Sequence, residues 1–404
     1  MPGRDALKAK EMKRKGNFYD RIISMQNLQA AAIVARKGKG HQPGVIEFLK
    51  NEEGNLLALH HVLQEGNYKT SPYHNFSIFE PKERLISKLP FFPDRIVHHA
   101  IMLILEPYIV SWFTADTYSC IKGRGIHAAS RAIRRALRDE KGTIYYVKID
   151  IQKFYPSVDH KILKQLLRRK IKDERLLSLM DEIIDNAPGL PIGNLLSQYF
   201  ANFYLSSMDR FIKEQLKIRN YFRYADDILI LGADKPSLHQ VRAQIQDYLL
   251  TKLRLIIKRN YRVAPVYPQG IDILGYVYFH THTRLRPTIK VSFCKIIATK
   301  PNRASIGSYY GWAKHADCKH LFKTLLSNEK FQRHGDHAFL NKLYRRQNQN
   351  GRHFKSRNPG VRLSDRGFDT QSRHEMPLDA DRSRWPEACS FLWRKGAPSN
   401  DPAG

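Results

Sequence analysis

The sequence predicts an α+β fold in which helices surround a small antiparallel sheet. Short runs rich in β-branched and aromatic residues alternate with longer stretches whose apolar residues recur at helical spacing. The clearest short runs also carry acids, because residues 143–150 end in Asp150 and residues 222–231 contain Asp226 and Asp227. With 404 residues, 42% of them hydrophobic, the chain is large enough to bury a substantial core around such a sheet.

The chain is strongly basic. Lys and Arg number 68 against 38 Asp and Glu, which gives a formal net charge of +30. Because 11% of the residues are aromatic and the composition is that of a globular protein, this charge belongs to a folded surface and not to a disordered basic chain. It excludes an acidic or neutral surface and favours a polyanionic partner, either a nucleic acid or an anionic membrane.

Neither the apolar segments nor the cysteines indicate export. The apolar run at 101–105 is far shorter than the roughly 20 residues of a membrane-spanning helix. The N-terminal residues are charged throughout, unlike a secretory signal, so we expect a cytoplasmic protein without a membrane partner. The four cysteines form no CxxC pair and predict reduced thiols, not a disulfide framework or a zinc module.

The N-terminal third predicts a basic segment followed by helices and one hairpin. Residues 1–44 are basic and end in RKGKGHQPG, which lacks the GxxxxGK[ST] pattern and so favours a flexible loop over a phosphate cradle. Helical spacing predicts one helix from 45 to 63. Residues 76–87 are typical of a hairpin, and a Pro-Asp pair opens a helix over 96–105.

The middle of the chain predicts strands and helices around the acids. Residues 143–150 have the length and composition of a buried strand, and the apolar run at 222–231 predicts two short strands hinged at the acidic pair. Helical spacing predicts four further helices, at 160–170, 174–185, 196–212 and 238–253.

The C-terminal part predicts one strand at 271–279, an amphipathic helical region at 305–326 and, beyond about residue 331, an irregular basic tail. In the tail, Arg, Asn, Gly, Asp and Ser replace aliphatic residues and no apolar period remains. Such a tail is either a dispensable solvated extension or an arm that binds RNA or a protein partner.

Asp150, Asp226 and Asp227 are the candidate catalytic residues, because they lie at the ends of apolar strands, where water is partly excluded. Desolvating neighbouring carboxylates raises their pKa values unless a counter-charge is supplied, and Mg²⁺ or Mn²⁺ supplies one through hard oxygen ligands. Two such ions suit nucleotidyl transfer, since together they activate an attacking hydroxyl and neutralise departing pyrophosphate. The alternative is that the acidic pair only makes a hairpin turn, where Asp is favoured.

The residues around these acids form two motifs of one family. The pattern D-x-x-x-F-Y begins at Asp150, and the pattern Y-A-D-D ends at Asp227. With these motifs the chain resembles a reverse transcriptase. The resemblance implies that Asp150 and Asp226 bind two Mg²⁺ ions, with Mn²⁺ as a substitute, that Asp227 is their neighbour in the site, and that the Ile151 carbonyl is a further ligand.

The resemblance also implies the architecture. Members of this family have the right-hand polymerase fold, an α+β arrangement of fingers, palm and thumb in which an antiparallel palm sheet carries the three acids. The implied parts are a basic N-terminal segment (1–44), the fingers (45–140), the palm with its insert helices (141–279), the thumb (280–330) and the irregular basic tail (331–404).

Other motifs of the family imply contacts to nucleotide and primer. Tyr155 would stand as an aromatic gate against a ribose 2′-hydroxyl, or else be a core tyrosine. Lys82 and Arg84, in a segment resembling the fingers motif, would meet the triphosphate of a dNTP, or else lie in a solvated basic turn. Leu274-Gly275-Tyr276 resembles the primer-grip turn, and Lys258 is the candidate proton donor to pyrophosphate, although nearby arginines compete for that alignment.

One departure from the common family pattern narrows the assignment. Most reverse transcriptases have Gln-Gly-x-x-x-Ser-Pro before the long helix, whereas this chain has Ile192-Gly193-x-x-x-Ser197-Gln198. Together with a thumb-like segment at 308–315, this pattern resembles the reverse transcriptases of diversity-generating retroelements. Ile192, Gly193 and Gln198 would lie at the dNTP. Because Ile192 offers shape but no hydrogen bond, a mispaired nucleotide would lose less binding energy and fidelity should fall; alternatively, Ile192 is only a packing residue.

This subtype implies error-prone, RNA-templated DNA synthesis. The enzyme would copy a template-repeat RNA into cDNA with misincorporation opposite adenines, and the cDNA would replace a variable repeat in a target gene, which is mutagenic retrohoming. The implied partners are dNTPs, the template-repeat RNA with its cDNA, and an accessory variability determinant protein that is a small basic oligomer, in a bacterial, archaeal or phage-infected cell. The alternatives are a group II intron or retron reverse transcriptase, and a catalytically silent RNA-binding protein of polymerase fold.

Overall fold

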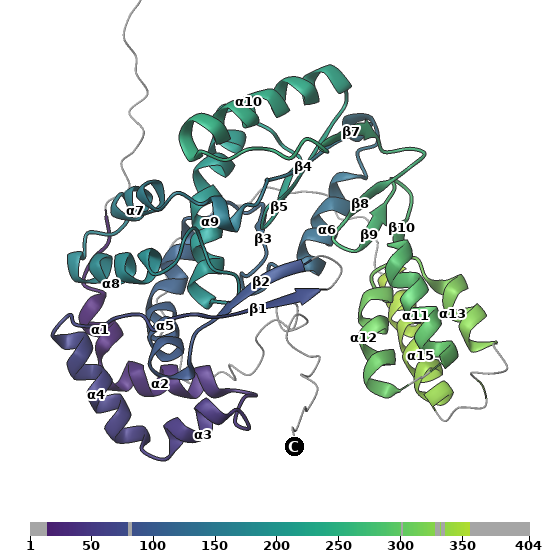
Figure 1. Cartoon of the computed structure of the whole chain (residues 1–404). Coiled ribbons are helices and arrows are strands. Elements are labelled where there is room, and N and C mark those ends of the chain that lie inside the picture. The colour runs from purple at the N-terminus through teal and green to yellow at the C-terminus, as the bar shows by residue number, and fades with distance from the viewer. Residues whose placement is uncertain (1–13, 80–82, 300–301, 328–331, 333–335, 356–404) are drawn as a thin grey trace, which may run out of the picture. The chain divides into compact units, whose positions relative to one another are not determined.

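The computed structural model describes residues 14–79, 83–299, 302–327, 332 and 336–355 (Figure 1). Within these residues the chain forms two compact units. The larger unit is drawn from Met1–Arg124 and Tyr145–Ala264, and the smaller unit from Gly125–Ile144 and Pro265–Gly404. Helices and mainly antiparallel sheets make up both units, which confirms the predicted α+β class.

The larger unit begins with four helices: α1 (Tyr19–Ile23), α2 (Met25–Arg36), α3 (Pro43–Leu49) and α4 (Glu52–Gln64). The prediction of one helix over 45–63 is wrong, because the helix breaks at Asn51. The side chain of Asn51 accepts a hydrogen bond from the Gly54 N–H at 3.2 Å and so caps a new helix. Local capping therefore outweighs the continuous apolar spacing.

The predicted hairpin is confirmed, since β1 (His74–Phe79) pairs antiparallel with β2 (Glu83–Lys88). A short helical turn, η1 (Phe91–Arg95), leads into α5 (Ile96–Ser111), which is longer than the predicted 96–105. The helix continues through Pro107. Ile109, beyond the proline, is buried, so packing of the last turn compensates for the hydrogen bond that the proline cannot donate.

A five-stranded sheet forms the centre of the larger unit. Its strand order is β3-β5-β6-β4-β7, and the strands are β3 (Thr117–Tyr118), β4 (Tyr145–Asp150), β5 (Tyr221–Tyr224), β6 (Asp227–Gly232) and β7 (Arg262–Pro265). β6 pairs antiparallel with β4 and with β5, whereas the short β3 pairs parallel with β5. The strands predicted at 143–150 and 222–231 are confirmed, and the two predicted strands of the latter meet at the acidic pair.

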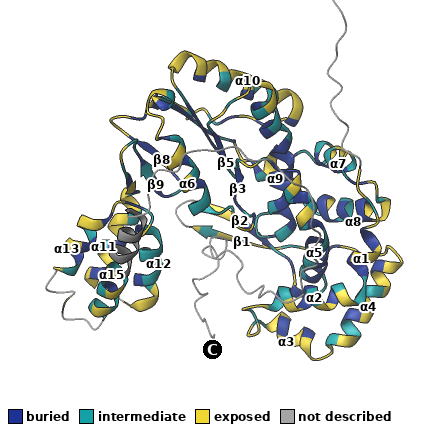
Figure 2. Ribbon diagram, turned by 180° about the vertical axis from the view of Figure 1, so that it is seen from behind, coloured by how far each residue is buried: buried dark blue, intermediate teal, exposed yellow. Residues whose placement is uncertain are grey.

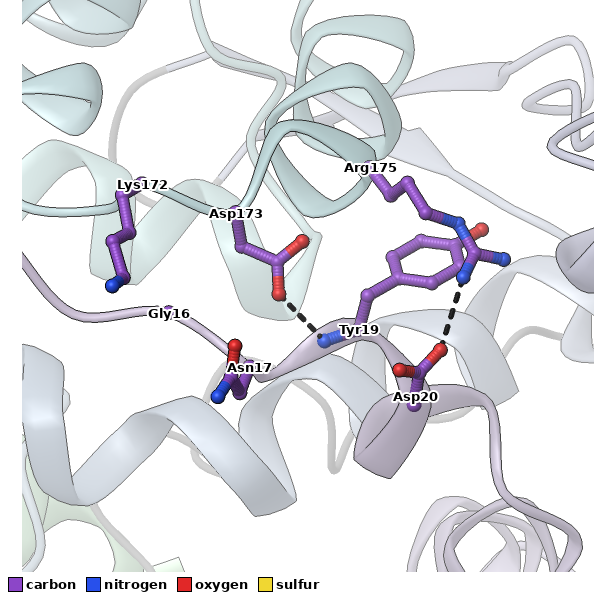
Figure 3. Close-up of a pocket in the computed structure, with 7 residues that line it drawn as sticks. All are labelled: Gly16, Asn17, Tyr19, Asp20, Lys172, Asp173 and Arg175. Carbon is purple, nitrogen blue, oxygen red and sulfur yellow. Dashed lines mark hydrogen bonds and ion pairs between the residues drawn. The ribbon is translucent and has the colours of Figure 1, made fainter.

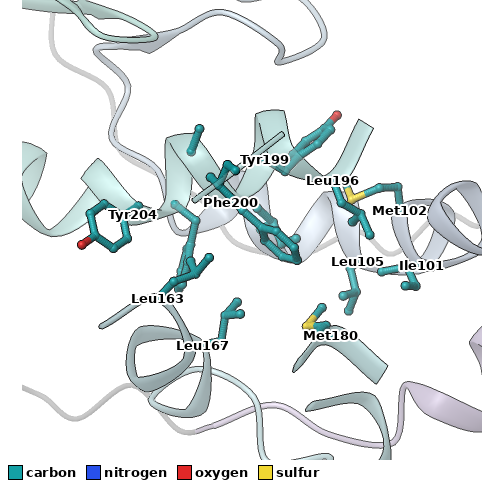
Figure 4. Close-up of a cluster of buried hydrophobic side chains, with 14 of the residues drawn as sticks. Ile101, Met102, Leu105, Leu163, Leu167, Met180, Leu196, Tyr199, Phe200 and Tyr204 are labelled. Atoms are coloured by element: carbon teal, nitrogen blue, oxygen red, sulfur yellow. The ribbon is translucent and has the colours of Figure 1, made fainter. Parts of the chain in front are cut away.

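The core of the larger unit lies between this sheet and its helices. The predicted central helices are confirmed as α7 (His160–Arg168), α8 (Glu174–Asp185), α9 (Leu195–Arg210), with a short continuation η4 (Phe211–Gln215), and α10 (Lys235–Leu253). Figure 4 shows Leu196, Phe200 and Tyr204 of α9 among side chains of α5, α7 and α8, and Figure 2 shows α9 as largely buried. No described helix is long and apolar enough to cross a bilayer.

The smaller unit contains α6 (Ile126–Ala136), a short turn η2 (Lys141–Thr143), and a three-stranded antiparallel sheet of β8 (Ile271–Ile273), β9 (Tyr276–Tyr278) and β10 (Thr283–Leu285). The prediction of a single strand over 271–279 is wrong. Leu274 and Gly275 both have positive φ, 56° and 81°, and they turn the chain between β8 and β9. Two consecutive residues of positive φ are typical of a tight hairpin turn.

The rest of the smaller unit is helical: α11 (Pro287–Thr299), α12 (Arg303–Ala313), α13 (Lys319–Leu326) and α15 (Asp336–Lys355). The prediction of an irregular tail from 331 is wrong for α15. Leu340 is fully buried, and the Tyr310 hydroxyl of α12 donates to the Leu343 carbonyl at 2.9 Å. Packing against α12 and α13 thus stabilises a helix whose second half is too polar to be predicted. The tail residues 356–404 lie outside the described part.

His98 on α5 makes the stability of the larger unit depend on pH. Its side chain is 2% exposed, and burial together with the nearby Arg95 charge lowers its pKa to about 3. Between that value and the ordinary pKa of about 6.5, the unfolded chain binds a proton that the folded chain does not. Stability is therefore lost as pH falls through this range.

In wild type, the free energy of unfolding should fall between pH 7 and pH 4.5. In His98→Leu this fall should be smaller by about 2 to 3 kcal/mol, as measured by urea unfolding at both pH values. The exposed His41 gives the control, since His41→Leu should keep the wild-type pH dependence. Equal pH dependence in all three proteins would contradict this prediction.

Candidate active site

Strand pairing brings the three predicted acids together. Asp150, the last residue of β4, lies directly opposite Asp227, the first residue of β6. Ala225 and Asp226 form the turn between β5 and β6, and Ala225 adopts a left-handed φ of 54° to make it. Residues that are far apart in the sequence thereby form one acidic site where the inner strands β4, β5 and β6 meet, at one end of these strands.

The site disfavours its own negative charge. Burial, and repulsion from Asp227 and Asp150, raise the pKa of Asp226 to about 6, although Lys258 acts in the opposite direction. One oxygen of Asp150, Oδ1, is buried and has no hydrogen-bond partner among the described residues. Both features indicate a place where additional positive charge would be stabilising.

Lys258 supplies part of that charge. Its ammonium nitrogen lies 2.5 Å from Asp150 Oδ2, and its backbone N–H donates to the Asp150 carbonyl at 2.8 Å. The segment is held in place by further backbone contacts, because Gln152 N–H donates to the Ile256 carbonyl at 2.8 Å and Ile151 forms an antiparallel bridge with Ile257. The structure therefore brings Lys258 into the acidic site, where it forms an ion pair with a carboxylate.

The chemistry of these side chains fits a hard divalent cation, because Mg²⁺ prefers carboxylate oxygens as ligands. Asp226 is desolvated and Asp150 Oδ1 has no hydrogen-bond partner among the described residues, so both would gain from a bound cation. In their present orientations, no three His, Cys, Asp or Glu side chains of the described residues converge on one point. Lys258 contacts Asp150 instead. Binding an ion at Asp150 Oδ2 requires that this ion pair open.

The residues predicted to surround a nucleotide come from three segments that contact one another. The carbonyl of Tyr155 accepts from the Leu190 N–H at 2.8 Å, and the carbonyl of Ile192 accepts from the Ser87 N–H of β2 at 2.8 Å. A Cβ on Gly193 would lie 3.0 Å from the Ser87 carbonyl oxygen. The Ile192-Gly193 segment is thus fixed between β2 and the Tyr155 segment.

The other predicted nucleotide contacts are less constrained. Arg84 is exposed on β2, opposite Ile78. Gln198 is half-buried in the first turns of α9. Lys82 lies outside the described residues. Their proximity to a nucleotide stays a prediction.

The predicted primer-grip residues lie in the smaller unit. Leu274 and Gly275 form the turn between β8 and β9, and Tyr276 begins β9. The Tyr276 hydroxyl donates to the Trp312 carbonyl at 3.1 Å, and a Cβ on Gly275 would lie 2.5 Å from the Trp312 ring. Only glycine therefore fits here, and the turn packs against the thumb-like segment 308–315.

The sequence patterns did not predict one buried salt bridge near the three acids. Arg223 of β5 and Asp209 of α9 form a salt bridge of 2.6 Å in which both side chains are 0% exposed. A signal was present for Arg223 alone, since it is a charged residue inside the apolar and aromatic run at 221–225. The partners are 14 positions apart, in different elements, and no local period relates them.

A separate cavity of about 220 Å³ contains none of the predicted site residues. It lies between the N-terminal segment and the start of α8, lined by Gly16, Asn17, Tyr19, Asp20, Lys172, Asp173 and Arg175 (Figure 3). Asp173 accepts from the backbone N–H of Tyr19 at 2.9 Å, and Arg175 pairs with Asp20 at 3.0 Å. These pairings attach the N-terminal segment to α8, so we assign the cavity a structural role.

A family profile and individual similar proteins point to the same protein family. The profile of the family described as reverse transcriptase (RNA-dependent DNA polymerase) matches residues 75–278. Protein YkfC of Escherichia coli K12 is 24% identical over 332 residues, covering 69% of this chain and 86% of YkfC. The retron Ec73 reverse transcriptase of E. coli is 27% identical over 241 residues, covering 53% of this chain and 73% of that protein.

Other similar proteins are longer than the matched region. The group II intron-encoded protein LtrA of Lactococcus lactis is 27% identical over 170 residues, which are 39% of this chain and only 28% of LtrA. Among solved structures, the apo telomerase of Candida tropicalis is matched with a TM-score of 0.45 and 12% identity, over 71% of this chain and 59% of that one.

Proposed function

The chain belongs to the reverse transcriptase (RNA-dependent DNA polymerase) family, and from this we propose that it extends a primer along an RNA template by attack of the primer 3′-hydroxyl on the α-phosphorus of a dNTP. The observation that carries the proposal is the meeting of Asp150, Asp226 and Asp227 where β4, β5 and β6 pair. As part of it we assign residues 45–140 to fingers, 141–279 to palm and 280–330 to thumb.

Asp150 and Asp226 are the proposed ligands of Mg²⁺, with Asp227 as their neighbour and the Ile151 carbonyl as a further ligand. Two bound divalent ions, Mg²⁺ or Mn²⁺, would lower the pKa of the attacking hydroxyl and neutralise the leaving pyrophosphate. The unsatisfied Oδ1 of Asp150 and the raised pKa of Asp226 support this assignment, because both favour added positive charge.

The chain's own cations and aromatic residues have proposed roles beside the acids. Lys258 is already within the site and, once released from Asp150, could donate a proton to pyrophosphate. Lys82 and Arg84 bind the triphosphate, and Tyr155 excludes a ribose 2′-hydroxyl. Gln198 lies at the dNTP, and the turn Leu274-Gly275-Tyr276 holds the primer.

We further propose that the enzyme belongs to a diversity-generating retroelement. The support is the Ile192-Gly193-x-x-x-Ser197-Gln198 pattern, in which Ile192 is held by its backbone to Ser87 of β2. The proposed product is cDNA of a template-repeat RNA with errors opposite adenines, destined for a variable repeat. An accessory variability determinant protein is the proposed protein partner.

Similarity to LtrA and to the retron Ec73 enzyme favours a second candidate, a group II intron or retron reverse transcriptase. The two candidates differ in genomic context. A template-repeat and variable-repeat pair beside the gene would support the first, and an intron or retron RNA in its place would support the second.

The activity itself is tested by extension of a labelled DNA primer on an RNA template with Mg²⁺ and dNTPs. Product lengthening that stops on chelation of the metal is expected. RNA binding without any extension, under conditions where the cognate RNA and accessory protein are present, would instead favour the catalytically silent alternative.

Ile192→Gln is expected to lower misincorporation opposite template adenines by roughly two- to tenfold, because a side-chain amide adds about one net hydrogen bond of discrimination. The measurement is sequencing of cDNA made from one RNA template. Ile192→Val, which keeps an apolar shape, should stay error-prone. An unchanged error rate in Ile192→Gln would show that Ile192 does not determine fidelity.

A further inference from the structure

Arg223 is a fully buried cation immediately before the turn that carries the acids. It belongs to β5, and only Tyr224 separates it from Ala225. Both Arg223 and its partner Asp209 are 0% exposed. A buried arginine in an apolar strand is uncommon, and its contacts indicate what it does.

All five N–H donors of the Arg223 guanidinium are used. Nε donates to Asp209 Oδ1 at 2.7 Å and Nη2 to Asp209 Oδ2 at 2.6 Å, a bidentate pair. Nη1 donates to Asn202 Oδ1 at 3.0 Å, and Nη2 to the Asn202 carbonyl at 3.3 Å. The fifth bond, from Nη1, goes to the carbonyl of Ala225 in the catalytic turn at 3.0 Å.

Asp209 connects this cation to two strands. Its Oδ1 accepts from the Tyr221 hydroxyl of β5 at 2.5 Å, and its Oδ2 accepts from the Thr117 hydroxyl of β3 at 2.9 Å. The carboxylate is therefore saturated and cannot rotate without breaking several bonds. The guanidinium that it holds is equally fixed, so the Ala225 carbonyl is bonded to a rigid charged donor.

Stability alone gives no reason for this arrangement. Removing two charges from water costs about as much as their attraction returns, and apolar pairs of similar volume are often as stable as buried ion pairs. What an apolar pair cannot provide is a donor for the Ala225 carbonyl. That carbonyl belongs to a residue in the left-handed region, at φ 54°, a strained conformation that needs support from its surroundings.

We propose that Arg223 is the positioning residue of the catalytic turn: by holding the Ala225 carbonyl it fixes the direction in which Asp226 and Asp227 point. The proposal rests on the proposed polymerase function of these acids. Arg223 touches neither substrate nor metal in this role. It acts through the backbone of the turn, with Asp209 as its anchor in α9.

The first test is Arg223→Lys, which keeps the buried charge but cannot reach Asp209, Asn202 and Ala225 together. We expect the extension rate at saturating dNTP to fall by about 100-fold, since small displacements of reacting groups have effects of this size. RNA affinity should change by less than about threefold. Tm is measured alongside, because buried acceptors that lose Arg223 lower it. Calorimetric Mn²⁺ binding should weaken by at least about threefold, because the ligands are no longer aligned.

The second test removes both charges in Arg223→Met/Asp209→Leu, with the same expected loss of rate and of Mn²⁺ affinity. Arg219→Met is the matched control, because Arg219 is exposed on the segment leading into β5 and should leave all four quantities unchanged. A folded variant with the wild-type rate and Mn²⁺ affinity would overturn the proposal. A rate that falls only in step with Tm would also overturn it, since the role would then be structural.

Failure of the proposed function is separable from failure of this inference. If wild type does not extend a primer, the polymerase assignment fails, whatever the variants do. If wild type extends a primer and Arg223→Lys matches it, only the positioning role fails.

Discussion

Asp226→Asn is expected to reduce RNA-templated primer extension by at least about 1,000-fold, the scale of loss seen when a principal catalytic group is removed. The substitution replaces a desolvated carboxylate, which is repelled by Asp227 and Asp150, with a neutral amide of the same shape. Metal binding at the proposed site loses an anionic ligand, while the backbone of the turn is unchanged. RNA affinity, measured by fluorescence anisotropy, should be unaffected.

Stability distinguishes this loss from misfolding. The pKa of Asp226 is raised to about 6, so at neutral pH the metal-free protein carries this charge at a greater cost in the folded than in the unfolded chain. Removing the charge should therefore leave the Tm in EDTA equal to or above that of wild type. Asp234 provides a matched control: it is exposed and caps α10 by accepting from the Ser237 N–H at 2.8 Å.

Asn is an equally good cap, so Asp234→Asn should keep wild-type activity and stability. Wild-type extension by Asp226→Asn would remove Asp226 from the site. Loss of extension in both variants would mean that the assay reports something other than the acids.

Gly189→Ala is expected to lower the free energy of unfolding by about 2 to 4 kcal/mol, because left-handed strain and steric overlap add. Gly189 has φ +60°, and a Cβ there would lie 2.5 Å from the Tyr155 carbonyl oxygen and 2.6 Å from that of Pro156. Backbone atoms cannot rotate away as a side chain can. The clash should therefore separate the two segments.

The same change should affect the nucleotide. Separation breaks the bond between the Leu190 N–H and the Tyr155 carbonyl, which fixes the Ile192 segment relative to the proposed gate. We expect the KM for dNTP to rise by about tenfold or more in single-nucleotide incorporation, measured alongside urea unfolding.

Gly66→Ala isolates the effect of strain from that of contact. Gly66 also has a left-handed φ, +74°, but a Cβ there would meet nothing within 4 Å. It should cost only about 1 kcal/mol and leave the dNTP KM unchanged. Equal effects at the two glycines would show that the close approach at Gly189 is unimportant.

Sequence patterns predicted an element well where its own residues set its ends. The strand at 143–150 and the long helix ending near Ile212 were found because apolar spacing is local and their cores are continuous. Prediction failed where one capping or turn residue decided the path. Asn51 divided a predicted helix, and Leu274-Gly275 divided a predicted strand.

Prediction also failed where distant packing stabilised a weak pattern. The helix α15 was predicted to be irregular because its second half is polar, yet buried Leu340 attaches its first half to the other helices of the smaller unit. Similarly, α5 continues past Pro107 because Ile109 is buried.

For the candidate site, too, the features set by local sequence were predicted and those set by distant packing were not. The amino-acid sequence by itself determined that acids stand at the ends of apolar strands and that the surface is strongly basic, because both are properties of residue type and local order. Only the tertiary structure decided that Lys258 pairs with Asp150 across 108 positions and that Arg223 donates a hydrogen bond to the Ala225 carbonyl in the turn of the acids. Such contacts depend on strand register and on the packing of helix against sheet, which no local period encodes.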